Sequence, residues 1–417
     1  MDKDLLKGLF ETAVERAQPA LAVSQFLPQK PKGRTIVIGA GKASAQMARA
    51  FEKAWDGPLN GLVVTRYGYA EKCEQIEIVE AAHPVPDAAG FEAARRIVEL
   101  LQGLSADDLV VALISGGGSS LLPAPAEGMS LEDEQAVNRA LLASGAPIGV
   151  MNLIRNQFSS IKGGRLALAA APARVATLVV SDVPGDDPAL VASGPTISLA
   201  GTRAEARKYA ALYGLELPAA AQKILAGEDN IAPRSDDPRF VNNSVVTIAS
   251  AALSLTAAAD KARAMGIEAA VLSDSIEGEA RDVALVHAAI AKEIALRNQP
   301  FSKPVVLLSG GETTVTLRGK GRGGRNGEFL LSLAIALDGV EGVTALAGDT
   351  DGIDGSEDNA GAFVDGTSAR RMREAGVDPL AAQANNDAYT AFEAIGDLFV
   401  TGPTGTNVND FRAILIR

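Results

Sequence analysis

The sequence predicts a two-domain α/β protein whose strands form mainly parallel sheets covered by helices on both faces. Apolar runs of strand length alternate with helix-like segments almost from end to end, which is typical of such sheets. Composition agrees: 42 of the 417 residues are glycine and only 4% are aromatic. Glycine is thus above its usual level of about 7%, which suits many tight strand-to-helix turns better than a β-sandwich. The length exceeds the roughly 100–200 residues of one domain.

The N-terminal half contains the clearest elements. Residues 109–114, Leu-Val-Val-Ala-Leu-Ile, predict a buried strand because the run has no polar alternation and leads directly into glycines. Residues 175–180 repeat this pattern and end in Ser181-Asp182. The strands predicted in this half are 35–39, 61–65, 76–79, 109–114 and 175–180, and the helices are 42–55 and 91–101.

The C-terminal half continues the alternation. Its predicted strands are 245–249, 305–308, 313–317 and 344–347, and its predicted helices are 280–296 and 329–337. Residues 230–239 hold two prolines and several charges, which is typical of a linker. We therefore expect a large domain over residues 1–240 and a smaller one over 241–417.

Several function classes are disfavoured. A net charge of −12 leaves no general basic surface for nucleic acid. The single cysteine, Cys73, excludes an intrachain disulfide, and two histidines, His83 and His287, make a histidine-rich zinc centre a poor hypothesis. The start has no signal-peptide pattern, and the long uncharged stretch at 240–259 is too polar to span a membrane. We expect a cytoplasmic protein, a monomer or homodimer, with a small-molecule substrate.

Glycines follow the predicted strands at one end. They stand at Gly39-Ala-Gly41, Gly116–Gly118, Gly310-Gly311 and Gly348. In open α/β sheets the carboxyl ends of the strands are where ligands bind. The pattern predicts a binding cleft at this edge.

The first glycine loop, Gly39-Ala-Gly41-Lys42-Ala-Ser44, matches neither of the common nucleotide motifs. A dinucleotide fingerprint needs glycine where Ser44 stands and an acidic residue after the second strand, where Arg66 stands. A Walker A motif needs Ser or Thr directly after the lysine, and Ala43 is there. A lysine at the first turn of a helix, where cations are disfavoured, indicates a nearby anion.

The second loop, Ser115-Gly116-Gly117-Gly118-Ser119, follows the most buried strand. Consecutive glycines allow the backbone to approach a ligand, and consecutive N–H groups can bind an anion. We expect the serine hydroxyls to add donors.

A cationic segment runs from Arg318 through Lys320 and Arg322 to Arg325, interleaved with glycines. We expect a flexible arm whose guanidinium groups bind phosphate or carboxylate oxygens. It leads into the helix predicted at 329–337.

Two acidic loops follow strands, one from Asp182 to Asp187 and one from Asp349 to Asp358. Carboxylates on glycine-rich turns suit Mg²⁺, which takes one or two of them together with phosphates and water. Cations, phosphate-compatible glycine loops and such carboxylates at one edge favour phosphoryl transfer over hydride transfer.

Many longer motifs, from about residue 5 to residue 412, resemble the glycerate 2-kinase family, whose C-terminal region is called the MOFRL domain. The resemblance implies a Rossmann-like three-layer α/β/α large domain and a smaller α/β domain with the MOFRL region at about 303–411. It departs at Gly327, where the family commonly has glutamine. The motifs are Gly39–Ser44, His83–Asp87, Ser115–Ser119, Lys162–Arg165, Ser181–Val183, Ala192–Thr196, Ser309–Thr314, Gly323–Asn326, Thr350–Gly355, Asn385–Asp387 and Thr401–Asn409.

The resemblance implies ATP-dependent phosphorylation of D-glycerate to 2-phosphoglycerate with a divalent cation, at a site in an interdomain cleft. The family's essential lysine falls on Lys42 and its key arginine on Arg325. Asp182 and Asp351 are our candidate metal ligands, with Mg²⁺ as the metal. The expected substrate- and phosphate-binding residues are Gly39, Gly41, Ser44, His83, Ser115, Gly116, Gly117, Gly118, Ser119, Lys162, Arg165, Asn326, Thr404 and Asn407.

Two other interpretations stay open. One is an NADP-dependent hydroxypyruvate reductase, since several family members carried that label and Arg66 could meet a 2′-phosphate. The other is a regulatory module that binds a sugar acid without catalysis. Lys42 and the carboxylate loops speak against the second.

Overall fold

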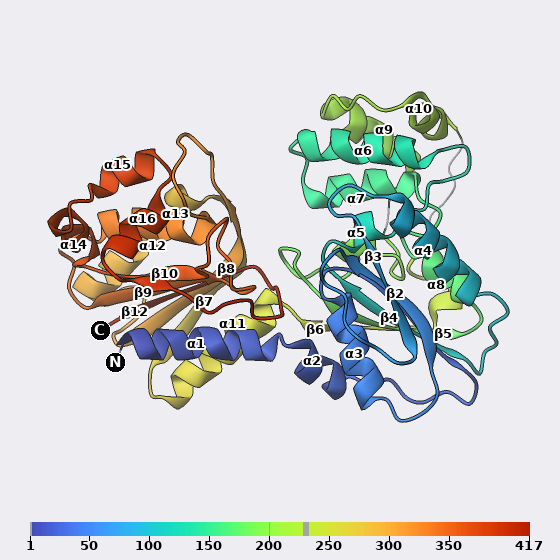
Figure 1. Cartoon of the computed structure of the whole chain (residues 1–417), viewed down its shortest axis with the longest axis horizontal. Coiled ribbons are helices and arrows are strands. Elements are labelled where there is room, and N and C mark those ends of the chain that lie inside the picture. Colours follow the sequence, from blue (N-terminus) through green and yellow to red (C-terminus); the bar gives the residue numbers. More distant parts are fainter. Residues whose placement is uncertain (1, 200, 228–232) are drawn as a thin grey trace. The chain divides into compact units, whose positions relative to one another are not determined.

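The computed structural model describes residues 2–199, 201–227 and 233–417. They form two compact units (Figure 1). The N-terminal unit contains Pro19–Val183 and Asp187–Ile248, and the C-terminal unit contains Ala249–Arg417, the segment before Pro19 and Pro184–Asp186. Residues 230–232 of the predicted linker lie outside the described part of the chain.

The N-terminal unit is built on a six-stranded sheet in the order β3-β2-β1-β4-β5-β6. This is the strand order of dinucleotide-binding folds, and the pairings from β3 to β5 are parallel. The strands are β1 (Thr35–Ala40), β2 (Asn60–Arg66), β3 (Ile76–Ala81), β4 (Leu109–Ser115), β5 (Arg174–Val180) and β6 (Ser244–Ala249).

Helices cover both faces of this sheet. One face packs its apolar residues against α4 and α8, and α3 contacts the sheet through β1, β2 and β4. The strands are buried on both sides, which explains their unbroken apolar sequence. These helices are α2 (Pro19–Gln25), α3 (Ser44–Ala54), α4 (Ala88–Leu100), α5 (Gly118–Leu121) and α8 (Arg165–Ala170), with short 3₁₀ turns at Val191–Ser193 and Pro238–Phe240.

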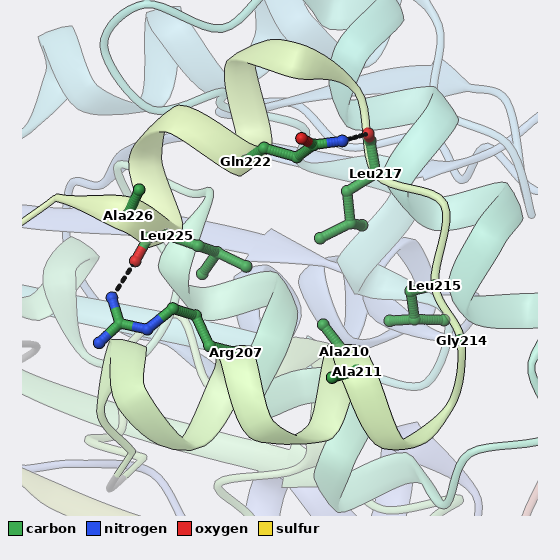
Figure 2. Close-up of a pocket in the computed structure, with 9 residues that line it drawn as sticks. All are labelled: Arg207, Ala210, Ala211, Gly214, Leu215, Leu217, Gln222, Leu225 and Ala226. Atoms are coloured by element: carbon green, nitrogen blue, oxygen red, sulfur yellow. Dashed lines mark hydrogen bonds between the residues drawn. The ribbon is translucent and has the colours of Figure 1, made fainter.

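Four further helices gather at one end of the N-terminal unit (Figure 1). They are α6 (Leu131–Ala143), α7 (Ile148–Gln157), α9 (Arg203–Leu212) and α10 (Ala219–Ala226), and they share a small apolar core. A cavity of about 320 Å³ lies between α9 and α10. Its lining residues are drawn in Figure 2, where Arg207 donates to the carbonyl of Leu225. Gln222 closes the other end by donating to the carbonyl of Leu217 at 2.7 Å. The residues described as its lining include none of the predicted site residues.

The C-terminal unit is built on a mixed sheet in the order β11-β10-β9-β12-β8-β7. Only β7 and β8 are parallel among its described pairings. The strands are β7 (Glu268–Glu279), β8 (Val305–Thr314), β9 (Val343–Asp349), β10 (Gly361–Asp365), β11 (Leu398–Phe399) and β12 (Asp410–Ile416).

Alternate residues of this second sheet enter two different cores. Val305 and Leu307 face α12 and α13, whereas Val306 and Leu308 face α1 and α11. The unit is therefore a three-layer arrangement. Its helices are α1 (Asp2–Arg16), α11 (Ala251–Ala264), α12 (Ala280–Arg297), α13 (Arg325–Ala336), α14 (Ser368–Glu374), α15 (Pro379–Ala384) and α16 (Ala388–Ala394).

The structure corrects three expectations. The second sheet is not mainly parallel, because the last strand, β12, enters between β8 and β9. Residues 313–317 are not a separate strand, since β8 continues through Gly310 and Gly311 while paired with β12. Helix α1 packs on the C-terminal unit, whereas the predicted boundary placed residues 1–240 together.

Candidate active site

The two glycine loops of the N-terminal unit are bonded directly to each other. The N–H of Lys42 donates to the carbonyl of Gly116 at 2.9 Å. Gly41 has a φ of +144°, and a Cβ there would lie 2.0 Å from Ser115 Oγ. Only glycine fits this position, so the pairing of the loops dictates the sequence here.

The serines at the base of these loops are structural. Ser44 is fully buried and its hydroxyl donates to the carbonyl of Leu113 at 2.9 Å. Ser115 is 1% exposed, and its oxygen accepts from the N–H of Ala43 at 3.0 Å. Internal partners hold both hydroxyls in this structure, so their role toward a ligand stays a prediction.

Lys42 and His83 converge over Gly117. A Cβ on Gly117 would lie 3.0 Å from His83 Nε2 and 3.3 Å from Lys42 Cε. Lys42 precedes α3, which begins at Ser44, so it stands on the loop and not in the first turn. Burial, together with the positive charges of Lys42 and Arg66, lowers the pKa of His83 to about 4. His83 is therefore neutral at pH 7.

Asp182 completes this side of the loop. It follows β5, and a Cβ on Gly116 would lie 1.7 Å from its Oδ2. The carboxylate occupies the space that a side chain at Gly116 would need. Lys42, His83 and Asp182 thus flank the Gly116-Gly117 backbone from three different connections of the sheet.

Lys162 and Arg165 serve the interior of the N-terminal unit. The Lys162 side chain is 2% exposed and its Nζ lies 3.0 Å from Glu134 Oε1. Arg165 donates to the carbonyls of Asn156 and Lys162 at 3.0 and 2.9 Å. Internal oxygens hold both groups in this structure, and their role toward the substrate stays a prediction.

In the C-terminal unit, Arg325 lies among three carboxylates. Its Nε donates to Asp410 Oδ1 at 2.6 Å, its NH2 group to Asp349 Oδ2 at 2.8 Å and its NH1 group to Glu312 Oε1 at 2.9 Å. The side chain is 22% exposed. Burial works against its charge, but the three carboxylates outweigh it and raise the pKa of Arg325. The guanidinium is a fixed positive charge.

The carboxylates around Arg325 crowd one another. Burial, with the negative charge of Asp351 next, raises the pKa of Asp349 well above its usual range, and Arg325 opposes this. Asp410 is fully buried in its side chain and also pairs with Arg412. Arg325 is thus the main compensating charge for Asp349.

Asn326 is also internal. It is completely buried, and its Nδ2 donates to Asp410 Oδ1 at 2.8 Å. Its backbone N–H donates to Asp354 Oδ1 at 2.9 Å, and that of Gly327 donates to Asp354 Oδ2 at 2.7 Å. The Nδ2 group thus links α13 to β12, and a contact of Asn326 with substrate stays a prediction.

The remaining predicted residues of this unit lie on two loops that are bonded to each other, one after β9 and one between β11 and β12. Asn407 Nδ2 lies 3.3 Å from Asp351 Oδ2, and the N–H of Thr404 donates to the carbonyl of Asp351 at 3.0 Å. The Thr404 hydroxyl donates to the carbonyl of Thr350. Asp351 is half-buried, and one of its oxygens faces only the neutral amide of Asn407.

The cationic segment is ordered and not a flexible arm. Its backbone N–H groups at Arg318 and Lys320 donate to Asn386 Oδ1 and Asn385 Oδ1 at 2.7 and 3.2 Å. Arg322 stacks on the ring of Tyr389 at 4.6 Å. These local partners hold the segment along the surface.

No group of three or more His, Cys, Asp or Glu residues suited to a metal ion occurs within residues 2–199, 201–227 and 233–417. Over the same ranges, no helix is both long and apolar enough to cross a membrane.

Sequence reasoning missed Glu312, Asp410 and Arg412. Arg412 is 1% exposed and is the largest fully buried side chain among the described residues. The signal that marks it is a pair of opposite charges, two positions apart, at the start of the otherwise apolar strand 410–416.

Two family models match the chain. Residues 5–226 match a family described as a domain of unknown function, DUF4147, and residues 305–410 match the MOFRL family.

Curated relatives cover nearly the whole chain. A protein of Agrobacterium vitis with the provisional name hydroxypyruvate reductase is 53% identical over 99% of this chain and 94% of its own length. A D-glycerate 2-kinase of Thermotoga maritima is 40% identical over 99% and 98%. The crystal structure of a glycerate kinase from Thermotoga maritima matches with a TM-score of 0.91 and 39% identity, covering 100% of this chain and 99% of the other.

Proposed function

The chain belongs to the glycerate 2-kinase family, and from that premise we propose that it transfers the γ-phosphoryl group of ATP to the 2-hydroxyl of D-glycerate, giving 2-phosphoglycerate. The observation that carries the proposal in this chain is the convergence of Lys42 and His83 over Gly117. A lysine above paired glycine loops, at the carboxyl ends of parallel strands, suits a phosphate group.

Two positively charged side chains provide electrostatic stabilisation in this proposal. Lys42 and Arg325 neutralise charge that develops on the transferred phosphoryl group, where catalysis consists mostly of positioning and charge stabilisation. Arg325 is held by its three carboxylates before substrate arrives, which removes the cost of ordering it during the reaction. His83 is neutral and supplies a hydrogen bond without adding charge.

The glycine loops contribute backbone groups. The N–H of Gly41 donates to the carbonyl of Val64 at 3.1 Å, and Gly39 lies within β1. We therefore assign the N–H groups of Gly116–Gly118 to the phosphates of ATP, with Gly39 and Gly41 giving the loop its close backbone approach. Thr404 and Asn407 are assigned to substrate, and hydrogen bonds join their loop to that of Asp351.

A magnesium ion fits this donor set only as a partner of the nucleotide. The described residues offer no group of three ligands, but Mg²⁺ bound to phosphates needs one or two carboxylates. Asp182 beside Gly116, or Asp351 with its half-buried carboxylate, would hold it. When bound, the ion would offset negative charge on the phosphates.

The test is a pair of assays on the purified chain. One couples ADP release to a detectable product with ATP, Mg²⁺ and D-glycerate, and the other follows NADPH oxidation with hydroxypyruvate. We expect glycerate-dependent ADP release and no NADPH oxidation. NADPH oxidation without ADP release would establish the reductase, and binding of glycerate without either turnover would establish a regulatory module.

A further inference from the structure

Ser119 stands at the end of the second glycine loop and is half-buried. Its Oγ lies 2.9 Å from Ser193 Oγ, and either hydroxyl could donate across this contact. The direction matters, because a hydroxyl has one proton to give but two lone pairs to receive with.

Asn152 decides the direction. Its Nδ2 donates to the carbonyl of Leu190 at 2.8 Å, which fixes the orientation of the amide. The Oδ1 atom, which can only accept, therefore faces Arg155 NH1 at 3.1 Å and Ser193 Oγ at 2.8 Å. Ser193 must donate its proton to Asn152.

The direction of the Ser193 bond determines what Ser119 in the glycine loop can do. Since the only proton of Ser193 is already committed to Asn152, Ser119 donates its own proton to Ser193. The outer face of the Ser119 oxygen then carries lone pairs alone. Ser119 can accept a hydrogen bond from a ligand, but it has none to give.

The backbone holds Ser193 in a costly conformation. Ala192, Ser193 and Gly194 have φ values of 53°, 61° and 58°, a left-handed run that side chains rarely adopt. The carbonyl of Ser193 accepts from Gly163 at 3.2 Å, and that of Gly194 accepts from Gly164 at 2.8 Å. Strain kept by surrounding contacts is typical of positions that serve a site.

We propose that Ser119 accepts a hydrogen bond from a hydroxyl group of the substrate hydroxy acid, with Ser193 and Asn152 as positioning residues that set the direction of this bond. The proposal rests on the proposed function for the identity of the substrate. A phosphate oxygen also has only lone pairs to offer, so it could not form a hydrogen bond with the Ser119 oxygen. A hydroxyl supplies the proton that the site lacks, so Ser119 distinguishes a hydroxyl of the acceptor from the phosphate groups of the nucleotide.

The test combines removal of Ser119 with removal of each substrate hydroxyl. Dissociation constants for D-glycerate, 3-hydroxypropionate (no 2-hydroxyl) and D-lactate (no 3-hydroxyl) are measured by calorimetry for the wild type and Ser119→Ala. KM values for D-glycerate and ATP are measured in parallel. Ser119→Ala should raise the KM for D-glycerate about tenfold and leave that for ATP unchanged. The analogue that lacks the recognised hydroxyl should bind both proteins equally, which also identifies the hydroxyl.

Three further results complete the design. Ser193→Ala frees the Ser119 proton and should weaken D-glycerate binding, whereas Ser24→Ala, which removes an exposed hydroxyl bonded to the carbonyl of Leu21, should have no effect. A raised KM for ATP in Ser119→Ala, or equal losses for all three acids, would overturn the proposal. A wild type that binds D-glycerate without releasing ADP would refute the kinase function alone, because the binding constants still decide the role of Ser119.

Discussion

Arg325 shows how single residues set the chemistry of the C-terminal unit. Each of its three donor groups faces a carboxylate, so both its charge and its direction are fixed. The same contacts mean that its removal does two things. It takes a cation from the proposed reaction and leaves Asp349 buried without its main compensating charge, whereas Asp410 keeps Arg412.

We predict that Arg325→Ala lowers kcat on the order of 10³-fold and also lowers the free energy of unfolding by about 3 kcal/mol. Steady-state kinetics and urea unfolding at pH 7 measure the two effects. Arg297→Ala, which removes an exposed ion pair with Glu293, is the control and should change neither. A normal kcat in Arg325→Ala would remove this residue from the mechanism.

Lys42 can be tested through its neighbour. Lys42→Ala should lower kcat at least a hundredfold, since it removes the phosphate-facing cation. It should also raise the pKa of His83, because the charge of Lys42 is one of the causes that hold this pKa near 4. Proton NMR suits the measurement, because the chain has only two histidines. An unchanged His83 titration would mean that the two side chains do not meet over Gly117 in solution.

His287 predicts a dependence of stability on pH. Its ring bonds to the carbonyl of Val283 and to Ser309 Oγ at 2.9 and 3.0 Å, and burial lowers its pKa from 6.5 to about 4. The unfolded chain binds the proton first, so stability falls as pH drops from 6.5 towards 4. His287→Gln should flatten this fall in urea unfolding between pH 7 and 5. The same slope in both proteins would contradict it.

Single residues were predictable where a strand ends and not where a partner is distant in sequence. Lys42 and Asp182 each follow a buried strand, so their place at the sheet edge followed from periodicity. Lys162 carried the same kind of charge, but its partner Glu134 stands 28 positions earlier on another helix. No feature of the sequence near Lys162 indicates that it pairs with Glu134.

At the scale of elements, the start of α13 explains a glycine-rich motif. Gly324 occupies the N-cap position, and a Cβ there would lie 2.5 Å from Asp354 Oδ1. Asp354 supplies the missing cap from another loop by accepting from two N–H groups of the first turn. Asp354 therefore fixes the orientation of the helix that begins with Arg325.

We predict that Asp354→Ala lowers kcat more than tenfold and the free energy of unfolding by about 2 kcal/mol, because buried N–H groups lose their acceptor. The matched control is Asp378→Ala, which removes the cap of α15 at Leu380. The control should lose about 1 kcal/mol without a change in kcat. Kinetics and thermal unfolding of both variants check this, and equal losses of kcat would reduce Asp354 to a structural cap.

Helices and strands were predictable where their own sequence shows that they are buried. Strands β1, β4 and β5 are buried on both faces and read as unbroken apolar runs. Strand β12 is equally buried but opens with Asp410 and Arg412, whose charges compensate each other only in the folded protein. The glycines of β8 indicated a turn, yet the strand continues through them while paired with β12. Gly311 has a φ of +121°, and a Cβ there would lie 2.2 Å from the carbonyl oxygen of Ile276 in β7.

At the scale of the whole molecule, the first helix belongs to the last sheet. Leu6, Leu9, Phe10 and Ala13 pack against α11 and the C-terminal strands. The rings of Phe399 and Phe411 lie edge-on to Phe10 at 5.0 and 5.7 Å. An amphipathic helix does not encode which sheet it covers, so its sequence could predict the helix but not its unit.

We predict that the two units respond separately to core mutations, and that Phe10→Ala destabilises the C-terminal one. The loss of a buried ring between two others should cost about 3 kcal/mol. The single tryptophan, Trp55, is 8% exposed, stacks on Phe51 and reports on the N-terminal unit alone. In Phe10→Ala, the circular dichroism transition should move to lower urea while the tryptophan fluorescence transition stays in place. Phe51→Ala should do the reverse, moving the fluorescence transition first. If both signals shifted together in either variant, the two cores would unfold as one cooperative system, and the assignment of α1 to a separately stable unit would be wrong.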